Sequence, residues 1–115
     1  MPYEQGDVVL VLFADSNLRT AKRRPGLVVM ADGLSTGLPQ TIVAMITSNM
    51  SRAGHPSRIN FERSGPSGRA MGLLTDSVVM TDNLATVLES EIDRSIGRCP
   101  EMARVRAAIR HTFGP

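Results

Sequence analysis

Two short polar segments of this sequence have the residue types needed for chemistry on a phosphodiester. The first is Arg23-Arg24-Pro25-Gly26, which runs directly into the apolar stretch Leu27-Val28-Val29-Met30. The second, Ile46-Thr47-Ser48-Asn49, ends another apolar stretch. A guanidinium donates two parallel hydrogen bonds and stays protonated, so an arginine held at a strand end by a proline is suited to gripping phosphate. Together the two segments predict a phosphodiester site.

Charge is distributed unevenly along the chain. From Ser16 to Leu73 only Asp32 and Glu62 oppose a series of basic residues, whereas the stretch from Leu74 onward is close to balanced. Such a basic stretch favours a polyanionic partner, although the same arginines could equally solvate loops. The candidate contacts to the phosphates or bases of such a partner are Lys22, Arg23, Ser48, Asn49 and Arg52.

Composition limits the remaining function classes. The 115-residue chain is expected to form a single domain, residues 1–115, and its longest apolar run, Val8 to Ala14, is too short to span a bilayer. The amino terminus lacks a basic region followed by an apolar signal segment, which favours a cytoplasmic location. The single Cys99 is expected to be a buried structural thiol, and no metal or cofactor is expected. With one tyrosine, three phenylalanines and no tryptophan, a base-stacking platform is not expected.

The apolar pattern predicts short strands followed by one helix. Val8 to Phe13 is a continuous apolar run typical of a buried strand. Pro100 suits the first position of a helix whose apolar face includes Val105 and Ile109, with Gly114 as a stop. Further strands are expected at 27–30, 41–47, 58–62, 77–80, 84–88 and 95–98, with a basic loop before Arg24, a loop at 48–57 and a flexible connection at 64–68. This order indicates a mainly β fold, a small barrel capped by one helix.

The ordered motifs resemble those of MazF/PemK toxins over nearly the whole chain. The segments that carry the resemblance are Gly6-Asp7-Val8-Val9, Arg24-Pro25 before Leu27-Val28-Val29, Ile46-Thr47-Ser48, Asp76-Ser77-Val78-Val79, Leu84-Ala85-Thr86-Val87, and Ser95-Ile96-Gly97 before a terminal helix. The resemblance implies an SH3-like small barrel of the CcdB/MazF type and a homodimer. It also implies a sequence-selective, metal-independent endoribonuclease of single-stranded RNA that a cognate antitoxin neutralises.

By position, Arg24 and Thr47 match the family's catalytic arginine and threonine. Charge stabilisation suits both residues, because RNA cleavage by its own 2′-hydroxyl passes through a pentavalent phosphorus with concentrated negative charge. A free guanidinium, with a pKa above about 12, is a poor base, so a part for Arg24 in proton transfer is implied by the resemblance alone. The chain departs from the family pattern in the acid-free loop at 16–23 and at Asn83-Leu84-Ala85-Thr86. The resemblance therefore does not extend to base preference or antitoxin contacts, which the family assigns to those regions.

Several alternatives remain open from the sequence. Arg24 could pair with a carboxylate such as Asp7 or Asp76, and Thr47 could simply end its strand. His55 has a side chain suited to acid–base work, but a solvated loop histidine is the plainer interpretation. Two other functions are a non-catalytic CcdB-like toxin that binds DNA gyrase through its helix, and an inactive barrel that binds RNA or a partner.

Overall fold

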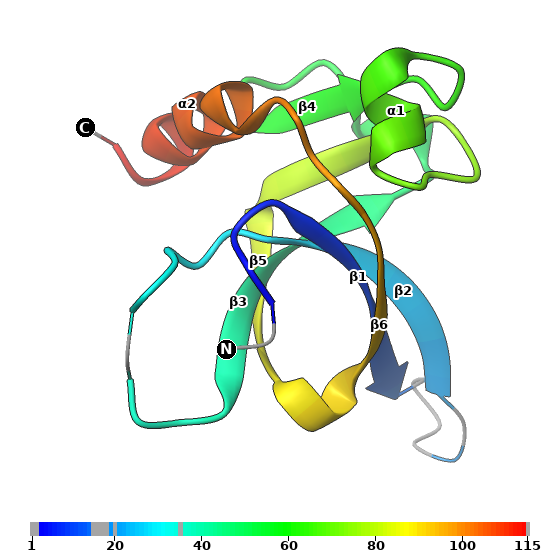
Figure 1. The fold of residues 1–115 in the computed structure, drawn as a ribbon. Helices are drawn as coiled ribbons and strands as arrows, with labels where there is room; N and C mark the ends of the chain where they lie inside the picture. The colour runs from blue at the N-terminus through cyan, green and yellow to red at the C-terminus, as the bar shows by residue number, and fades with distance from the viewer. Residues whose placement is uncertain (1–2, 15–18, 20, 35, 115) are drawn as a thin grey trace.

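Six antiparallel strands and a carboxyl-terminal helix make up the fold (Figure 1). The computed structural model describes residues 3–14, 19, 21–34 and 36–114; of the expected basic loop, positions 16–18 and 20 lie outside this set. The strands are β1 (Asp7–Ala14), β2 (Ala21–Val28), β3 (Gln40–Thr47), β4 (Arg58–Phe61), β5 (Ser77–Leu88) and β6 (Ile92–Arg98). The helices are α1 (Pro66–Ala70) and α2 (Met102–Phe113), with short 3₁₀ turns η1 (Met50–Arg52) and η2 (Glu89–Glu91).

The strands form one curved sheet in the order β4-β5-β3-β2-β1-β6. Figure 1 shows the sheet curling on itself, with α1 and α2 at one end. Within the described residues no strand pairing joins the outer strands β4 and β6, so the barrel-like sheet does not close. The expected mainly β fold with a terminal helix is therefore confirmed, in the form of an open barrel. No helix among the described residues is long and apolar enough to cross a membrane.

The first part of strand β1 has buried side chains on both faces, as its apolar run predicts, whereas Leu12 farther along is 39% exposed. Val8 belongs to a core cluster that includes residues of α2, whereas Val9 and Val11 belong to a second cluster on the other face of the sheet. All three are fully buried. Because successive side chains of a strand point to opposite faces, a two-sided core requires apolar residues at every position rather than at alternate ones.

Strand β2 begins earlier than expected. Lys22, Arg23 and Arg24 lie inside it and pair with β1, so the prediction of a loop was wrong for positions 21–23. Strand β3, however, pairs with β2 only between Gly26 and Val28. The basic half of β2 is therefore hydrogen-bonded to β1 but not to β3. Its charged side chains are exposed to solvent, so they can be accommodated in the strand.

Strand β5 replaces the two separate strands expected at 77–80 and 84–88. The single strand runs from Ser77 to Leu88, but its register against β3 jumps from Met80 to Leu84. The three skipped positions, 81–83, form a bend between the two paired halves of the strand. The bend lets one strand serve both β4 and the far end of β3.

The segment around 64–68 forms a helical turn rather than a flexible connection. Helix α1 begins at Pro66, whose missing N–H costs nothing at the start of a helix. Gly97 of β6 lets this region approach closely, because a Cβ there would lie 2.4 Å from the Ala70 carbonyl oxygen. At the other end of the chain, Pro100 lies before α2 instead of inside it, and Glu101 occupies the capping position.

Candidate active site

A cavity of about 730 Å³ opens where β2 and β3 separate. The predicted residues Arg23, Arg24, Thr47 and Ser48 all line it. The other lining residues are Leu10, Pro25, Met45, Ile46, Gly72, Leu73, Leu74, Thr75, Ser77, Met80, Asn83, Ala85 and Ile96. No described residue that lines the cavity is an aspartate or glutamate, so its polar lining favours an anion.

Pro25 explains why the strands separate at this point. The N–H of Val29 donates to the Ile42 carbonyl on the β3 side at 2.9 Å. The backbone N–H and C=O groups of successive residues point to alternate edges of a strand, so the backbone groups of Leu27 and Pro25 also point towards β3. Pro25 has no N–H to donate, and the observed pairing stops at Gly26 and Met45. The ladder between β2 and β3 therefore ends just before Pro25.

The register of this ladder relates Arg24 to Thr47. The pairs Val28–Val43, Leu27–Ala44 and Gly26–Met45 define it. Continued by two residues, the same register sets Arg24 opposite Thr47. Opposed residues of an antiparallel pair share one face of the sheet, so a cavity between the diverging ends receives both side chains. Two segments that are separate in the sequence are thus brought to one cavity.

The Thr47 side chain is half-buried and held in place by the backbone that follows it. Its Oγ1 accepts a hydrogen bond of 3.1 Å from the N–H of Asn49. Because the oxygen is engaged as an acceptor, the hydroxyl hydrogen stays available to a second partner. Thr47 therefore ends its strand and also presents a donor at the cavity.

Arg24 is exposed and has no hydrogen-bond or ion-pair partner among the described residues. The carboxylates considered from the sequence are used elsewhere. Asp7 accepts from Arg98 at 2.6 Å, and Asp76 accepts from the N–H of Arg63 at 2.9 Å. The alternative that Arg24 merely pairs with one of them is wrong.

Arg23 has different surroundings from its neighbour. Its Nε lies 3.1 Å from Oδ2 of Asp93 on β6, and its side chain is 60% exposed. An exposed ion pair of this kind contributes little to stability. Both arginines line the cavity, but the charge of Arg23 is partly balanced by Asp93, whereas no described carboxylate balances the charge of Arg24.

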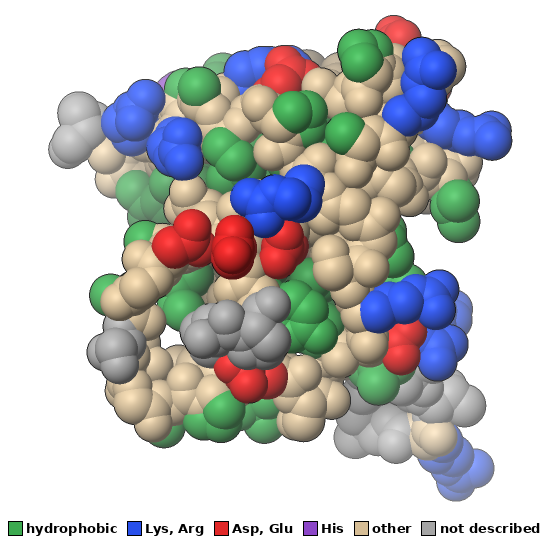
Figure 2. Space-filling model, in the orientation of Figure 1, with side chains coloured by type: hydrophobic (Ala, Val, Ile, Leu, Met, Phe, Trp, Pro, Cys, Tyr) green, Lys and Arg blue, Asp and Glu red, His purple; other side chains and the backbone are tan. Residues whose placement is uncertain are grey.

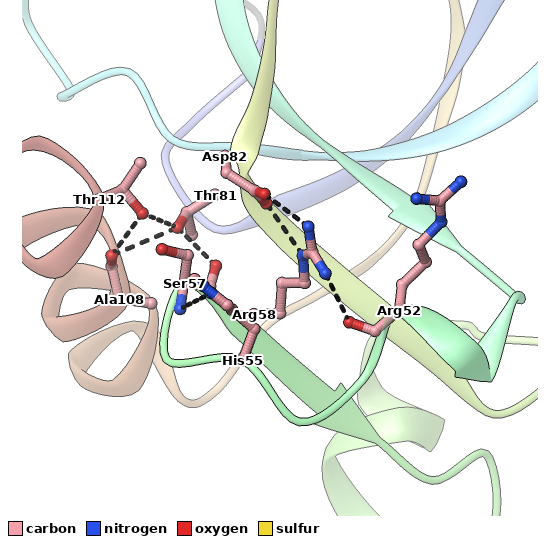
Figure 3. A network of polar contacts seen from close by, with 8 residues as sticks. All are labelled: Arg52, His55, Ser57, Arg58, Thr81, Asp82, Ala108 and Thr112. Atoms are coloured by element: carbon pink, nitrogen blue, oxygen red, sulfur yellow. Dashed lines mark hydrogen bonds and ion pairs between the residues drawn. The ribbon is translucent and has the colours of Figure 1, made fainter.

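The other predicted contacts lie away from the described cavity lining. Lys22 precedes the lining residues on β2. The side chain of Asn49 caps η1, where its Oδ1 accepts from the Ser51 N–H at 3.1 Å. Arg52 ends η1, and Figure 3 shows its guanidinium pointing away from the neighbouring polar network. Of the predicted RNA contacts, only Arg23 and Ser48 line the cavity.

Sequence reasoning missed the opposite wall of the cavity. This wall includes Leu73, Leu74 and Thr75, which follow α1, and Leu74 is 84% exposed. Gly72 makes the wall possible, because it has a positive φ of 74° and a Cβ there would lie 2.2 Å from the Ile96 carbonyl oxygen. In the sequence only Gly72, directly before this segment, hinted at such a close approach.

His55 does not line the cavity. Its Nδ1 accepts from the Ser57 N–H at 3.1 Å, and its ring meets His111 of α2 edge-on with centroids 6.2 Å apart. Both histidines are exposed, as expected from the sequence. Cys99 is buried, also as expected, and burial raises the pKa of its thiol. In the described part of the chain, no group of three or more His, Cys, Asp or Glu residues could hold a metal ion.

A second polar region lies at the bend of β5 (Figure 3). Arg58 forms a two-point ion pair with Asp82, at 3.2 and 2.7 Å, and also donates to the Arg52 carbonyl at 3.1 Å. The hydrogen bond from Arg58 lowers the pKa of Asp82. Beside this pair, the buried Thr81 hydroxyl contacts the Ser57 carbonyl and the Thr112 hydroxyl at 2.6 and 2.7 Å. This network joins β4, β5 and α2.

Several solved structures share the fold. The chain is 22% identical to the Mycobacterium tuberculosis toxin MazF-mt6, with a TM-score of 0.72 and coverage of 93% of this chain and 95% of that one. It is 19% identical to the MazF of a MazE-MazF crystal structure from Deinococcus radiodurans, with a TM-score of 0.74 and coverage of 97% and 96%. A mycobacterial endoribonuclease in complex with its cognate antitoxin gives 19% identity, a TM-score of 0.72 and coverage of 97% and 95%. At these identities the likeness concerns the fold. No curated protein sequence matches the chain.

The match to a protein family extends over nearly the whole chain. The family described as PemK-like, MazF-like toxin of type II toxin-antitoxin system matches residues 4–113, which include both strands of the cavity and the terminal helix. The chain therefore belongs to the PemK/MazF-like toxins of type II toxin–antitoxin systems.

Proposed function

We propose that this chain is a sequence-selective endoribonuclease that cleaves single-stranded RNA without a metal ion. The observation that carries the proposal is the common placement of Arg24 and Thr47 at one cavity without described carboxylates. Membership of a toxin family whose members are generally endoribonucleases supports it. We assign both residues to the chemistry.

Arg24 stabilises the charge that develops on the phosphorus centre. Attack of the 2′-hydroxyl on the adjacent phosphorus forms a 2′,3′-cyclic phosphate and breaks the bond to the 5′-oxygen of the next nucleotide, and the proton lost by the 2′-hydroxyl is balanced by one that the leaving 5′-oxygen takes from solvent. Before the leaving group departs, negative charge is concentrated on the non-bridging oxygens. A guanidinium that has no partner among the described residues can donate two hydrogen bonds to them. Donors already aimed at developing charge lower the barrier without reorganisation during the reaction.

Thr47 supplies a hydroxyl donor to the same group. Its oxygen accepts from the Asn49 N–H, which orients the hydroxyl hydrogen away from that contact. Arg23 and Ser48 contact neighbouring phosphates or bases from the cavity rim, and Lys22, Asn49 and Arg52 do so from outside it. Leu74, which is 84% exposed, provides apolar surface for an unstacked base.

The protein acts in the cytoplasm as a homodimer and is neutralised by a cognate antitoxin. One of the solved structures to which the chain is similar is a mycobacterial endoribonuclease in complex with its cognate antitoxin. The predominantly basic first part of the chain suits an acidic antitoxin segment as well as RNA.

Mapping RNA ends in cells that express the protein tests the proposal. Ends clustered at one short motif are expected for the wild type, and they should disappear in Arg24→Ala and Thr47→Ala. Purified protein should give the same ends in the presence of EDTA. Intact RNA together with blocked DNA replication would instead support a gyrase-binding toxin. Equal toxicity of wild type and Arg24→Ala would support a binding protein without catalysis.

A further inference from the structure

A second hollow lies where β4 gives way to α1. It has a volume of about 440 Å³, and Arg63, Ser64 and Arg69 line it. Both arginines are exposed. Within the described residues, neither guanidinium has a hydrogen-bond or ion-pair partner. The hollow thus carries two positive charges that no described carboxylate balances.

The backbone holds these two arginines at the same hollow. Gly68 of α1 packs directly on the chain that follows β4, because a Cβ there would lie 2.0 Å from the Glu62 carbonyl oxygen and 3.1 Å from Cα of Arg63. The Gly65 N–H closes the turn by donating to the same Glu62 carbonyl at 3.1 Å. A side chain at position 68 would push α1 away and separate Arg69 from Arg63.

The hollow is also tied to the wall of the catalytic cavity. Asp76 follows the wall segment 72–75, and its Oδ1 accepts from the backbone N–H of Arg63 at 2.9 Å. Asp76 contacts the backbone of Arg63 here, and no ion pair joins it to the Arg63 guanidinium. The contact with the backbone keeps the hollow at a constant position relative to Thr75 and the cavity.

Basic side chains therefore occupy both sides of the catalytic cleft. In Figure 2 lysine and arginine side chains gather over the region of α1 at the upper right and over the start of β2 at the lower right, and a hollow separates them. The upper group lies beside the hollow of Arg63 and Arg69, and the lower region includes Lys22, Arg23 and Arg24. A strand that crosses the cavity between these groups would meet positive charge on both sides.

We propose that Arg63 and Arg69 bind backbone phosphates of the RNA on one side of the cleaved bond. The inference rests on the proposed ribonuclease function. The surface that lines the hollow is mostly carbon atoms of Arg63, Ser64 and Arg69, and no large aliphatic or aromatic side chain is among the described lining residues, whereas the centre of a protein interface is enriched in such side chains. Two exposed arginines without a described partner beside an open hollow suit a flexible chain with regularly spaced charges. The site extends the bound RNA beyond the catalytic cavity.

Binding to single-stranded DNA of two lengths tests this site independently of cleavage, because DNA keeps the phosphates but lacks the attacking 2′-hydroxyl. The double variant Arg63→Ala/Arg69→Ala should bind a long oligonucleotide about three- to tenfold more weakly than the wild type at low salt. The slope of log Kd against log salt should fall by about 1.4, because single strands lose about 0.7 for each phosphate contact. A short oligonucleotide that covers only the cavity should bind both proteins equally.

Arg110→Ala is the matched charge control, because Arg110 is exposed on α2 and also has no partner among the described residues. It should leave both affinities and the salt slope unchanged. An equal loss in Arg110→Ala and in the double variant would overturn the proposed site, since general charge would then explain the effect. Unchanged binding of the long oligonucleotide by the double variant would also overturn the proposed phosphate site. A double variant that loses antitoxin binding but keeps its oligonucleotide binding would do the same.

Cleavage assays separate this inference from the proposed function. The double variant should cut a short RNA at the wild-type rate and a long RNA with a raised KM and an unchanged kcat. If the wild-type protein cuts no RNA, the proposed function fails, whatever the DNA-binding result. If it cuts both RNAs and the double variant matches it on both, only the distal site fails.

Discussion

Arg24 and Arg58 lie on strands of the same sheet but have opposite surroundings. Arg58 is used within the fold, where it pairs with Asp82 through two nitrogens and donates to the Arg52 carbonyl. Arg24 has no partner among the described residues and lines a cavity instead. A guanidinium whose donors are satisfied by the protein holds elements together, whereas one left unsatisfied at a cavity is available to a ligand.

The two threonines beside these arginines show the same contrast. Thr81 is fully buried, and its hydroxyl contacts the Ser57 carbonyl, the Ala108 carbonyl and the Thr112 hydroxyl. The Thr47 hydroxyl has one contact, from the Asn49 N–H. The bend of β5 is therefore a structural polar network, whereas the end of β3 belongs to the proposed active site. Substitutions in the two regions should separate loss of activity from loss of stability.

Replacing Arg24 should give the largest effect. Arg24→Ala should lower the RNA cleavage rate about 10²–10³-fold, the usual cost of removing one transition-state donor. Because Arg24 is exposed and has no described partner, the melting temperature should not change. Gel assays of cleavage and thermal unfolding measure the two outcomes. Arg58→Ala is the control and should show the reverse, a lower melting temperature with cleavage largely kept.

Replacing Thr47 should have a somewhat smaller effect on the same reaction. Thr47→Ala should slow cleavage about 10²-fold, because it removes a hydroxyl donor at the developing charge. Thr47→Ser keeps the hydroxyl and its contact with Asn49, so it should remain within a few-fold of the wild type. If the serine variant is as slow as the alanine variant, Thr47 acts through its shape rather than through its hydroxyl.

At the structural network the expected effect is on stability. Thr81→Val keeps the shape of the side chain but removes its hydrogen bonds. The Ser57 carbonyl still accepts from the Thr81 N–H at 3.0 Å, and the Ala108 carbonyl from Thr112 at 2.8 Å. The cost should therefore be about 1 kcal/mol of unfolding free energy, measured by urea denaturation. A loss of cleavage at unchanged stability would contradict the division of the molecule into network and site.

The smallest effect concerns pH. The hydrogen bond from Arg58 lowers the pKa of Asp82 below its usual 3.8. A carboxyl group with a depressed folded-state pKa contributes stability that is present above the unfolded pKa and is lost as pH falls through the folded one. Asp82→Asn should therefore lower stability at neutral pH and reduce the further loss below about pH 4. Urea unfolding across acidic pH measures this.

Glu101 provides the comparison for that experiment. Its pKa is also lowered, mainly by the hydrogen bond from Ser67, so part of the acid-induced loss should persist in Asp82→Asn. If the acid limb of the stability curve is identical in wild type and variant, the Arg58–Asp82 pair does not stabilise the folded state.

Much of the candidate site could be predicted from the sequence, because the two residues proposed for catalysis lie in short local patterns. The Arg24-Pro25 step and the polar end of β3 are recognisable without a structure, and both line the cavity. The opposite wall could not be predicted. Leu73, Leu74 and Thr75 reach the cavity only because Gly72 and Gly97 allow a close approach between segments more than twenty positions apart in the numbering.

The errors in the fold have the same origin. Lys22, Arg23 and Arg24 look like a loop because they are charged, but β1 pairs with them and leaves their other side open. The residues 81–83 look like a break between strands, but the bend they form is stabilised by contacts of Thr81 with α2 and of Asp82 with β4. In each case a distant partner overrides the local preference.

By itself the sequence determined the strands with continuous apolar runs, the terminal helix and the two residues proposed for catalysis. Periodicity and residue chemistry act locally, so they can be seen along the chain. Only the tertiary structure decided which charged groups are paired. Arg58 on β4 pairs with Asp82 on β5, whereas Arg24 has no described partner. Arg63 and Arg69 line the same hollow because Gly68 lets α1 pack closely on the chain that follows β4. Pairing depends on distance in space, and long-range packing sets that distance.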